Sequence, residues 1–205
     1  MHATRGGPVR LIGVAGLSGS GKTTLAKALA RGHPGALVLS VDDYYRDLGH
    51  LAPDEREGGN FDDPAALDLD ALAADLARLR QGLGVDAPVY DFATHTRRPQ
   101  PRRIEPTGLI VVEGVLLLYA EAVRAQLDLS IYVDAPLDVC LLRRLRRDIL
   151  ERGRSVASVL AQYEATVRPM ALAYVLPQRD LADRTLSGEG PLDGGAAALL
   201  AELPL

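Results

Sequence analysis

The sequence is poor in cysteine, in lysine and in long apolar runs. Its single cysteine, Cys140, excludes an internal disulfide and cannot alone hold a structural metal, so we expect a buried thiol in a reducing compartment. The longest nearly unbroken apolar stretch, residues 109–120, contains Glu113 and is too short to span a bilayer, and residues 1–8 lack the apolar core of a signal peptide. These absences predict a cytoplasmic protein.

The chain has fewer basic than acidic residues, and nearly all of its basic residues are arginine. With 23 Lys and Arg against 27 Asp and Glu, the formal net charge is −4, so the chain as a whole has no electrostatic footprint for a nucleic-acid backbone or an anionic membrane. We therefore expect neither partner, and any anionic ligand must be held locally. Of the basic residues only Lys22 and Lys27 are lysines, which draws attention to both.

What is present is the composition of one globular domain. The 205 residues are 47% apolar and 24% charged, and we assign them to a single domain over 1–205 with its core over 9–186. Apolar runs predict strands over 9–15, 36–41, 109–112 and 129–133. Amphipathic segments predict helices over 23–30, 64–81, 119–125 and 137–151. This alternation indicates an α/β fold, a doubly wound parallel sheet with helices on both faces.

Two further segments have a readable pattern. Asp63 is a suitable N-cap and Pro64 a suitable first residue for the helix over 64–81. Residues 85–108 hold four prolines and are too irregular for a crossover helix, so we interpret them as a β-hairpin excursion. Such an excursion can form one wall of a site at the carboxyl edge of the sheet. Near the C-terminus, residues 196–203 look helical.

A glycine-rich turn follows the first apolar run. Residues 16–23 match G-x-x-x-x-G-K-[ST] between a strand and a helix, the context that a phosphate-binding loop requires. The glycines let backbone N–H groups converge on phosphate oxygens, and the helix N-terminus adds its positive dipole end. Lys22 would reach the β and γ phosphates, and the Thr23 hydroxyl would bind Mg²⁺. The expected nucleoside triphosphate ligands are Gly16, Ser18, Gly19, Ser20, Gly21, Lys22, Thr23 and Thr24.

This motif alone does not separate a kinase from a GTPase, an ATPase motor or a nucleotide sensor. No N-K-x-D segment for reading guanine occurs in the chain, which argues against a GTPase. The residues that bind a phosphoryl acceptor must therefore be sought elsewhere.

Acidic residues follow two of the predicted strands. Asp42 and Asp43 end the second strand, where a carboxylate could accept the proton of an attacking hydroxyl or, alternatively, cap a short helix. Glu113 ends the third and resembles the Walker B acid that orients a magnesium shell, the alternative being a strand-end acid that faces water.

An arginine-rich stretch holds six arginines in the twelve residues 143–154. A charge run is usually a solvated helix face, but arginine forks also bind phosphoryl oxygens, and Gly153 beside Arg154 would let the segment bend over a nucleotide. We favour a lid over residues 143–156. In the excursion, Tyr90, Phe92 and His95 could stack on a planar base or simply pack the hairpin.

Taken together, these segments resemble the uridine kinase (uridine-cytidine kinase) family over residues 9–183. The resembling motifs are G-x-S-G-S-G-K-T-T at 16–24, S-x-D-x-Y-Y at 40–45, N-F-D-x-P at 60–64, P-x-Y-D-F-x-T-H-T-R at 88–97, E-G-x-L-L-L at 113–118, R-R-x-x-R-D-x-x-E-R-G-R at 143–154, Q-Y at 162–163, V-x-P-M at 167–170 and A-D at 182–183. Each piece is weak, but their order and spacing together are specific. The resemblance implies a P-loop kinase fold, in agreement with the sheet predicted above.

The resemblance also implies roles for individual residues. The catalytic set would be Asp42 as the base, Lys22 and Arg147. The nucleoside would contact Asp42, Tyr45, Asp62, Tyr90, Phe92, His95, Arg144 and Gln162. Arg147 and Arg154 would hold the ATP phosphates, and the magnesium site would comprise Thr23, Asp42 and Glu113.

The implied activity is transfer of the γ-phosphoryl group of ATP, with GTP as another donor to consider, to the 5′-hydroxyl of uridine or cytidine in pyrimidine salvage. A homotetramer and feedback by CTP are implied in the same way. Other P-loop small-molecule kinases, such as phosphoribulokinase or pantothenate kinase, should lack the Y-x-F-x-x-H pocket, and a non-catalytic regulator should lack a base. The chain departs from the family at Asp63, where histidine is common, and after Asp183, where we expect a short last strand.

Overall fold

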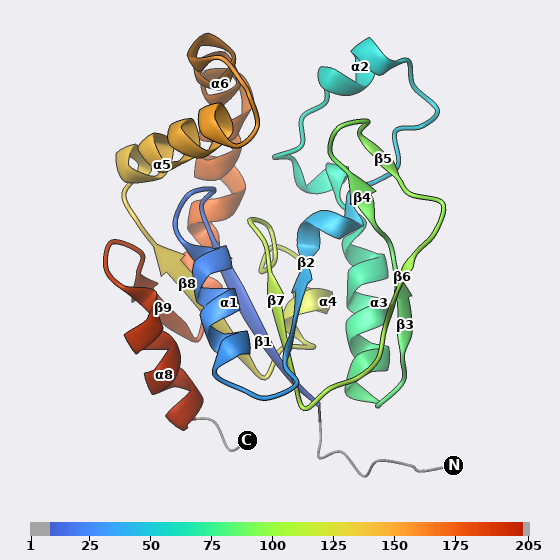
Figure 1. The fold of residues 1–205 in the computed structure, drawn as a ribbon, viewed down its shortest axis with the longest axis vertical. Coiled ribbons are helices and arrows are strands. Elements are labelled where there is room, and N and C mark those ends of the chain that lie inside the picture. The colour runs from blue at the N-terminus through green and yellow to red at the C-terminus, as the bar shows by residue number, and fades with distance from the viewer. Residues whose placement is uncertain (1–8, 203–205) are drawn as a thin grey trace.

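A five-stranded sheet whose strands all run parallel forms the centre of the molecule (Figure 1). The computed structural model describes residues 9–202. In spatial order the strands are β2 (Leu37–Ser40), β7 (Leu109–Glu113), β1 (Arg10–Gly16), β8 (Leu129–Asp134) and β9 (Arg184–Ser187). The four strands predicted from apolar runs are confirmed to within one residue at each end, and the expected short last strand is the four-residue β9.

Helices cover both faces of this sheet, as the doubly wound pattern predicts. One buried cluster joins Ile12 of β1 to apolar residues of α1 (Lys22–Arg31) and α8 (Leu192–Glu202). The other joins the next residue along the strand, Leu11, to α3 (Leu69–Arg80) and to the segment before α4 (Glu121–Arg124). Because successive side chains of a strand point to opposite faces, β1 is apolar on both sides and lies at the centre of the core.

The helix predicted over 64–81 is interrupted, and its predicted start at Pro64 is wrong. Asp63 does act as a cap, accepting from the Ala65 N–H at 2.8 Å, but only for the single turn η2 (Pro64–Ala66). The chain then extends at Leu67, a buried residue that bridges to Tyr45. Asp68 caps α3, its carboxylate accepting from Ala71. Burial of Leu67 therefore overrides the continuous helical periodicity.

Residues 85–108 form the predicted antiparallel excursion in two short ladders. The first pairs β3 (Val85–Ala87) with β6 (Arg102–Ile104), and the second pairs β4 (Tyr90–Asp91) with β5 (Thr96–Arg97). Together with α2 (Pro53–Glu57), the second ladder rises beyond the carboxyl ends of the strands (Figure 1).

On the other side of the phosphate loop rise α5 (Leu137–Leu150) and α6 (Val156–Gln162), joined by residues 151–155 (Figure 1). The chain continues from α6 through two π-helical turns, Tyr163–Val167 and Ala171–Val175, on either side of α7 (Arg168–Met170), and then through Leu176–Leu181. Pro169 lacks an N–H and would clash with the carbonyl four residues earlier in a regular α-helix, and the chain forms π turns on both sides of it. No helix within residues 9–202 has the length and apolarity to cross a bilayer.

Candidate active site

The phosphate loop joins β1 to α1 through backbone that only glycine adopts freely. Gly16, Gly19 and Gly21 have φ angles of +147°, +91° and +108°. A Cβ at Gly19 would lie 2.5 Å from the carbonyl oxygen of Cys140. No side chain caps α1 and no acidic residue lies in its first turn, so its first N–H groups are available to an anion. The loop therefore fits a chain of phosphates.

Beside the loop, Thr23 and Glu113 bring a hydroxyl and a carboxylate together. Thr23 Oγ1 donates to Glu113 Oε2 at 3.3 Å. Burial raises the pKa of Glu113, and the nearby charge of Lys22 opposes this rise. Among residues 9–202 no group of three or more His, Cys, Asp and Glu side chains is arranged to hold a metal ion. The Thr23 hydroxyl and the Glu113 carboxylate are oxygen ligands of the kind that Mg²⁺ takes, and this ion commonly keeps phosphate and water as its other ligands.

Asp42 lies in the single turn η1 (Val41–Tyr44) at the end of β2, and it is not the cap of that turn. Ser40 is the cap, since its Oγ accepts from the Asp42 N–H at 3.3 Å. The neighbouring acid, Asp43, points to the excursion and pairs with Arg102 at 3.1 Å. The two acids that the sequence could not separate thus lie in different environments.

The charges that act on Asp42 come from two segments, the phosphate loop and the arginine-rich run over residues 143–154. Burial raises the pKa of Asp42, and the charges of Lys22, Arg152 and Arg147 lower it. The Asp42 charge in turn contributes to the raised pKa of Glu113. Asp42 is therefore influenced both by the lysine of the phosphate loop and by two arginines of the 143–154 run.

A second acidic centre lies between the loop after α2 and the lid. Asp62 Oδ2 accepts from Thr166 Oγ1 at 3.4 Å. Burial raises the pKa of Asp62, and the charge of Arg144 is the main influence that lowers it. Arg144 also donates to Ser18 Oγ at 3.2 Å and to Gln162 Oε1 at 2.9 Å. Asp62, Arg144 and Gln162, predicted as one group of nucleoside contacts, thus come together from three distant segments.

Aromatic rings from three segments form one cluster near Asp42, whose charge raises the pKa of Tyr45. The Tyr45 ring lies 5.2 Å from Tyr90, 5.6 Å from Phe61 and 6.3 Å from Phe92, between ring centres. His95 stacks on Phe61 at 4.5 Å with an interplanar angle of 19°. The Phe92 side chain is 56% exposed, which is unusual for a large apolar ring, and aromatic residues are few in this chain. An open ring beside buried ones leaves an apolar surface on which a planar base could stack.

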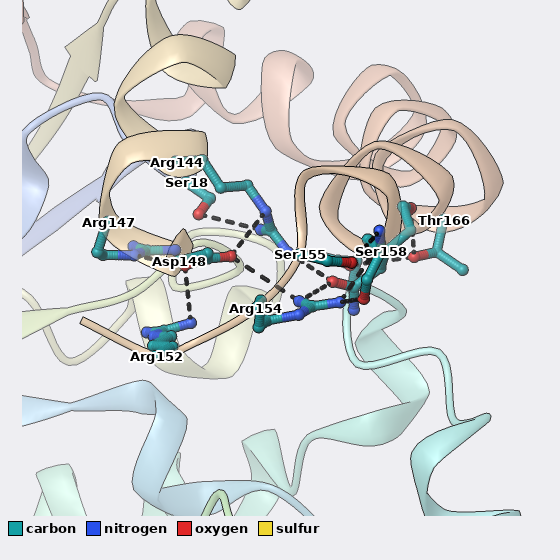
Figure 2. A network of polar contacts seen from close by, with 11 residues as sticks. Ser18, Arg144, Arg147, Asp148, Arg152, Arg154, Ser155, Ser158 and Thr166 are labelled. Atoms are coloured by element: carbon teal, nitrogen blue, oxygen red, sulfur yellow. Dashed lines mark hydrogen bonds and ion pairs between the residues drawn. The ribbon is translucent and has the colours of Figure 1, made fainter. Parts of the chain in front are cut away.

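The arginine-rich segment is a charged cluster centred on Asp148 (Figure 2). Asp148 is fully buried, and its carboxylate lies 2.9 Å from Arg147 Nε, 3.3 Å from Arg152 Nη1, 3.5 Å from Arg144 Nε and 3.8 Å from Arg154 Nη1. Arg154 also donates to Gln162 Oε1 at 2.6 Å. Four of the six arginines in this run thus form ion pairs with a buried carboxylate rather than lining a solvated helix face.

Another arginine of α5, Arg143, forms hydrogen bonds to the phosphate loop. Arg143 Nη1 donates to the carbonyls of Gly19 and Ser20, both at 3.3 Å, and to that of Gly188 at 2.9 Å. The Gly188 carbonyl lies directly after β9, so the last strand is fastened to the loop although its sequence diverges from the expected pattern.

Sequence reasoning missed several residues of this site. Phe61 was read only as part of a motif, and Thr166 carried no signal because it lies in an unpredicted π turn. Arg152 and Asp148 stood in the arginine run without assigned roles. An aspartate that directly follows two pairs of arginines in one helix was a usable signal for a buried ion-pair centre, because an unpaired buried carboxylate would be costly.

Comparisons with known proteins agree with this geometry. The sequence model of the Phosphoribulokinase / Uridine kinase family matches residues 11–188. A uridine kinase of Chloroflexus aurantiacus is 49% identical over 182 residues, which covers 88% of this chain and 87% of that protein. A possible uridine kinase from Bacillus stearothermophilus superposes with a TM-score of 0.62 at 20% identity, covering 90% of this chain and 91% of that one. Phosphoribulokinase from Rhodobacter spheroides has the same TM-score at 16% identity, with 90% and 74% covered, so the fold alone does not choose the acceptor.

Proposed function

This chain belongs to the phosphoribulokinase/uridine kinase family, and on that premise we propose that it transfers the γ-phosphoryl group of ATP to the 5′-hydroxyl of uridine and cytidine, giving UMP and CMP. The relative at 49% identity is named uridine kinase, and the identity extends over nearly the whole of both chains. The enzyme would thus act on small molecules, with pyrimidine salvage as its setting.

One observation carries the proposal: Asp42 stands within the electrostatic reach of Lys22, Arg147 and Arg152, and its charge also acts on Tyr45 of the aromatic cluster. A base must touch both the acceptor hydroxyl and the region where the γ-phosphoryl group is transferred. Among the described acids, Asp42 is supported best, because Asp43 is held by Arg102 in the excursion.

In the proposed reaction an Asp42 oxygen accepts the proton of the 5′-hydroxyl as the ribose oxygen forms its bond to the γ phosphorus. The bond from that phosphorus to the bridging oxygen breaks, and ADP leaves with the electron pair. Lys22 and Arg147 would stabilise negative charge on the phosphoryl oxygens, and Arg154 would support the triphosphate. Little covalent chemistry falls to the protein, so positioning and charge stabilisation dominate.

Mg²⁺, when bound with ATP, would neutralise charge on the β and γ phosphates. Thr23 and Glu113 would hold it, with Asp42 contributing through water, and the hydroxyl and carboxylate at 3.3 Å support this assignment. The phosphate loop with Ser18, Ser20 and Thr24 would bind the remaining phosphate oxygens.

The acceptor would be selected by the aromatic cluster and by the Asp62 group. Tyr90 and Phe92 would stack on the base, and His95, held flat against Phe61, would meet its polar edge. Asp62 and Arg144 would bind the ribose hydroxyls, since a buried carboxylate and guanidinium discriminate strongly for hydroxyl groups. A kinase for ribulose 5-phosphate or pantothenate would have no use for this ring cluster.

Product identification by mass spectrometry tests the proposal. The purified chain would be incubated with Mg-ATP and, separately, with uridine, cytidine, adenosine, ribulose 5-phosphate and pantothenate, and the uridine reaction would be repeated with GTP as donor. We expect UMP and CMP as the phosphorylated products. Turnover of another acceptor in place of these would overturn the pyrimidine assignment, and absence of any product would favour a nucleotide-binding regulator. Sedimentation of the same sample tests the homotetramer, and added CTP tests feedback.

A further inference from the structure

Asp148 occupies an unusual position for a carboxylate. It lies on α5, its side chain has no exposed surface, and four guanidinium groups from α5 and from the bend between α5 and α6 reach it (Figure 2). Its partners come from consecutive turns of α5 and from the bend itself: Arg144, Arg147, Arg152 and Arg154.

The charges of this cluster do not balance. One carboxylate faces four guanidinium groups, and only Arg144 is also influenced by the charge of Asp62, so an excess of positive charge remains. Burial lowers the pKa of Arg144, the charges of Asp62 and Asp148 raise it, and the charges of Arg147 and Arg154 lower it. The arginines therefore repel one another, and Asp148 is the group that contacts all four. A local surplus of positive charge around a buried anchor is suited to a polyanion that arrives later.

Each arginine also keeps donors that Asp148 does not use. A guanidinium carries five N–H groups, and the ion pairs with Asp148 involve one nitrogen of each arginine. The charges of Arg147 and Arg152 both lower the pKa of Asp42, so these two guanidinium groups act electrostatically on the proposed base. Two long side chains that carry many rotamers are thus restrained before any ligand binds.

We propose that Asp148 is the positioning residue of the lid: its carboxylate holds the guanidinium groups of Arg144, Arg147, Arg152 and Arg154 in one preorganised set, from which Arg147 and Arg152 meet the transferring phosphoryl group. Asp148 itself touches no substrate. The inference rests on the proposed function for the identity of the substrates, while the restraint of the arginines is a property of the unliganded protein.

Steady-state kinetics of Asp148→Asn test the proposal. The amide keeps the size of the side chain but removes its charge and presents an N–H group to the guanidinium donors. Loss of a preorganised donor to a transition state costs roughly 100-fold in kcat, and we expect a loss of about that size. The KM values for Mg-ATP and uridine should change by less than about threefold, because restraint of the arginines matters most when charge develops on the phosphoryl group.

Two companion variants separate positioning from a purely structural effect. Asp148→Glu returns the charge on a longer stem and should recover at least about tenfold of the lost kcat. Asp138→Asn removes a carboxylate from the exposed first turn of the same helix and should leave kcat unchanged. If Asp148→Asn lowers the melting temperature while its folded fraction keeps wild-type kcat, or if Glu gives no rescue, the proposal is wrong.

A measurement on the wild-type chain covers the case in which Asp148→Asn does not fold. Nuclear magnetic relaxation of the arginine Nε–H groups, without nucleotide or nucleoside, should give Arg144 and Arg147 order parameters near those of rigid backbone, about 0.85, and exposed Arg146 a value below about 0.6. Equal mobility of all three would overturn the proposal. This readout needs no turnover, so absence of uridine phosphorylation would reject the proposed function and leave the role of Asp148 to be decided by relaxation.

Discussion

Replacement of Asp42 by asparagine should move activity and stability in opposite directions. Asp42→Asn removes the base and keeps the shape of the side chain, so kcat should fall by about 10² to 10⁴, the usual contribution of general base catalysis. Lys22, Thr23 and the phosphate loop stay intact, so binding of Mg-ATP should change by less than about threefold.

The stability effect follows from the raised pKa of Asp42. In the unfolded chain an aspartate ionises near pH 3.9, whereas burial raises the pKa of Asp42 in the folded protein. Between these two values the folded protein binds more protons, so stability falls as pH rises through this window, and the loss is complete above the folded pKa. Each pKa unit corresponds to about 1.4 kcal/mol. Removing the charge should therefore stabilise the unliganded protein at pH 8, by less than burial alone would give, because the cations Lys22, Arg147 and Arg152 lose the charge that they oppose.

Thermal unfolding and single-turnover kinetics on the same preparations check both effects. Each kcal/mol gained raises the melting temperature of a protein of this size by roughly 2–4 °C, and the gain should vanish well below the unfolded-state pKa of about 3.9, where the wild-type carboxyl is protonated in both states. Asp43→Asn is the matched control for turnover, since Asp43 pairs with Arg102 away from the phosphate loop. Retained turnover in Asp42→Asn would remove Asp42 as the base, and a destabilised variant at pH 8 would refute the electrostatic argument.

Three other changes have distinct expected results. Glu113→Gln should raise the Mg²⁺ concentration for half-maximal turnover about tenfold, as removal of metal-orienting groups does, and an unchanged Mg²⁺ titration would place the cation elsewhere. Phe61→Ala removes the ring stacked on His95 at 4.5 Å, an aromatic pair worth about 0.5–1.5 kcal/mol, so the KM for uridine should rise roughly three- to tenfold with that for ATP unaltered; equal rises in both would reject a role in the nucleoside pocket. Gly188→Ala places a Cβ against the Ser20 carbonyl and should cost about 1–3 kcal/mol of unfolding free energy, measured by urea denaturation; a neutral result would mean that β9 is not fastened to the loop.

The central sheet was readable from the sequence because its strands are apolar on both faces, a pattern that few other structures share. The break between Pro64 and α3 was not readable. Leu67 and Leu69 continue a helical periodicity, and only the contact of Leu67 with Tyr45, more than twenty residues earlier, pulls the chain out of the helix. Helix propensity is a weak preference, and a tertiary contact that buries an apolar side chain can override it.

Some residues of the candidate site could likewise be predicted from the sequence, and others could not. Gly19, Lys22 and Thr23 could be predicted because a phosphate loop needs fixed residue types at fixed spacing. The choice between Asp42 and Asp43 could not, since both follow the strand and only Arg102 on the distant β6 separates them. Family resemblance named Asp42, and the physical reason for the difference between the two acids lies in tertiary contacts.

The fold buries three carboxyl groups of this site, although an ionised carboxylate is more stable in water. Burial is the largest influence on Asp42, Asp62 and Glu113, and it raises the pKa of each. The Asp42 charge raises the pKa of the other two further, so the acids also oppose one another. A protein selected for stability alone would replace them, whereas a phosphoryl transfer site needs acids for the proton, the cation and the ribose within one small volume. The lid arginines around Asp148 are the opposite excess of charge. The arginines offset the acids only in part, since burial still raises the pKa of Asp42 and of Asp62 above the ordinary value. A magnesium-bound triphosphate would supply the cation for the acids and the anion for the arginines that the fold alone does not.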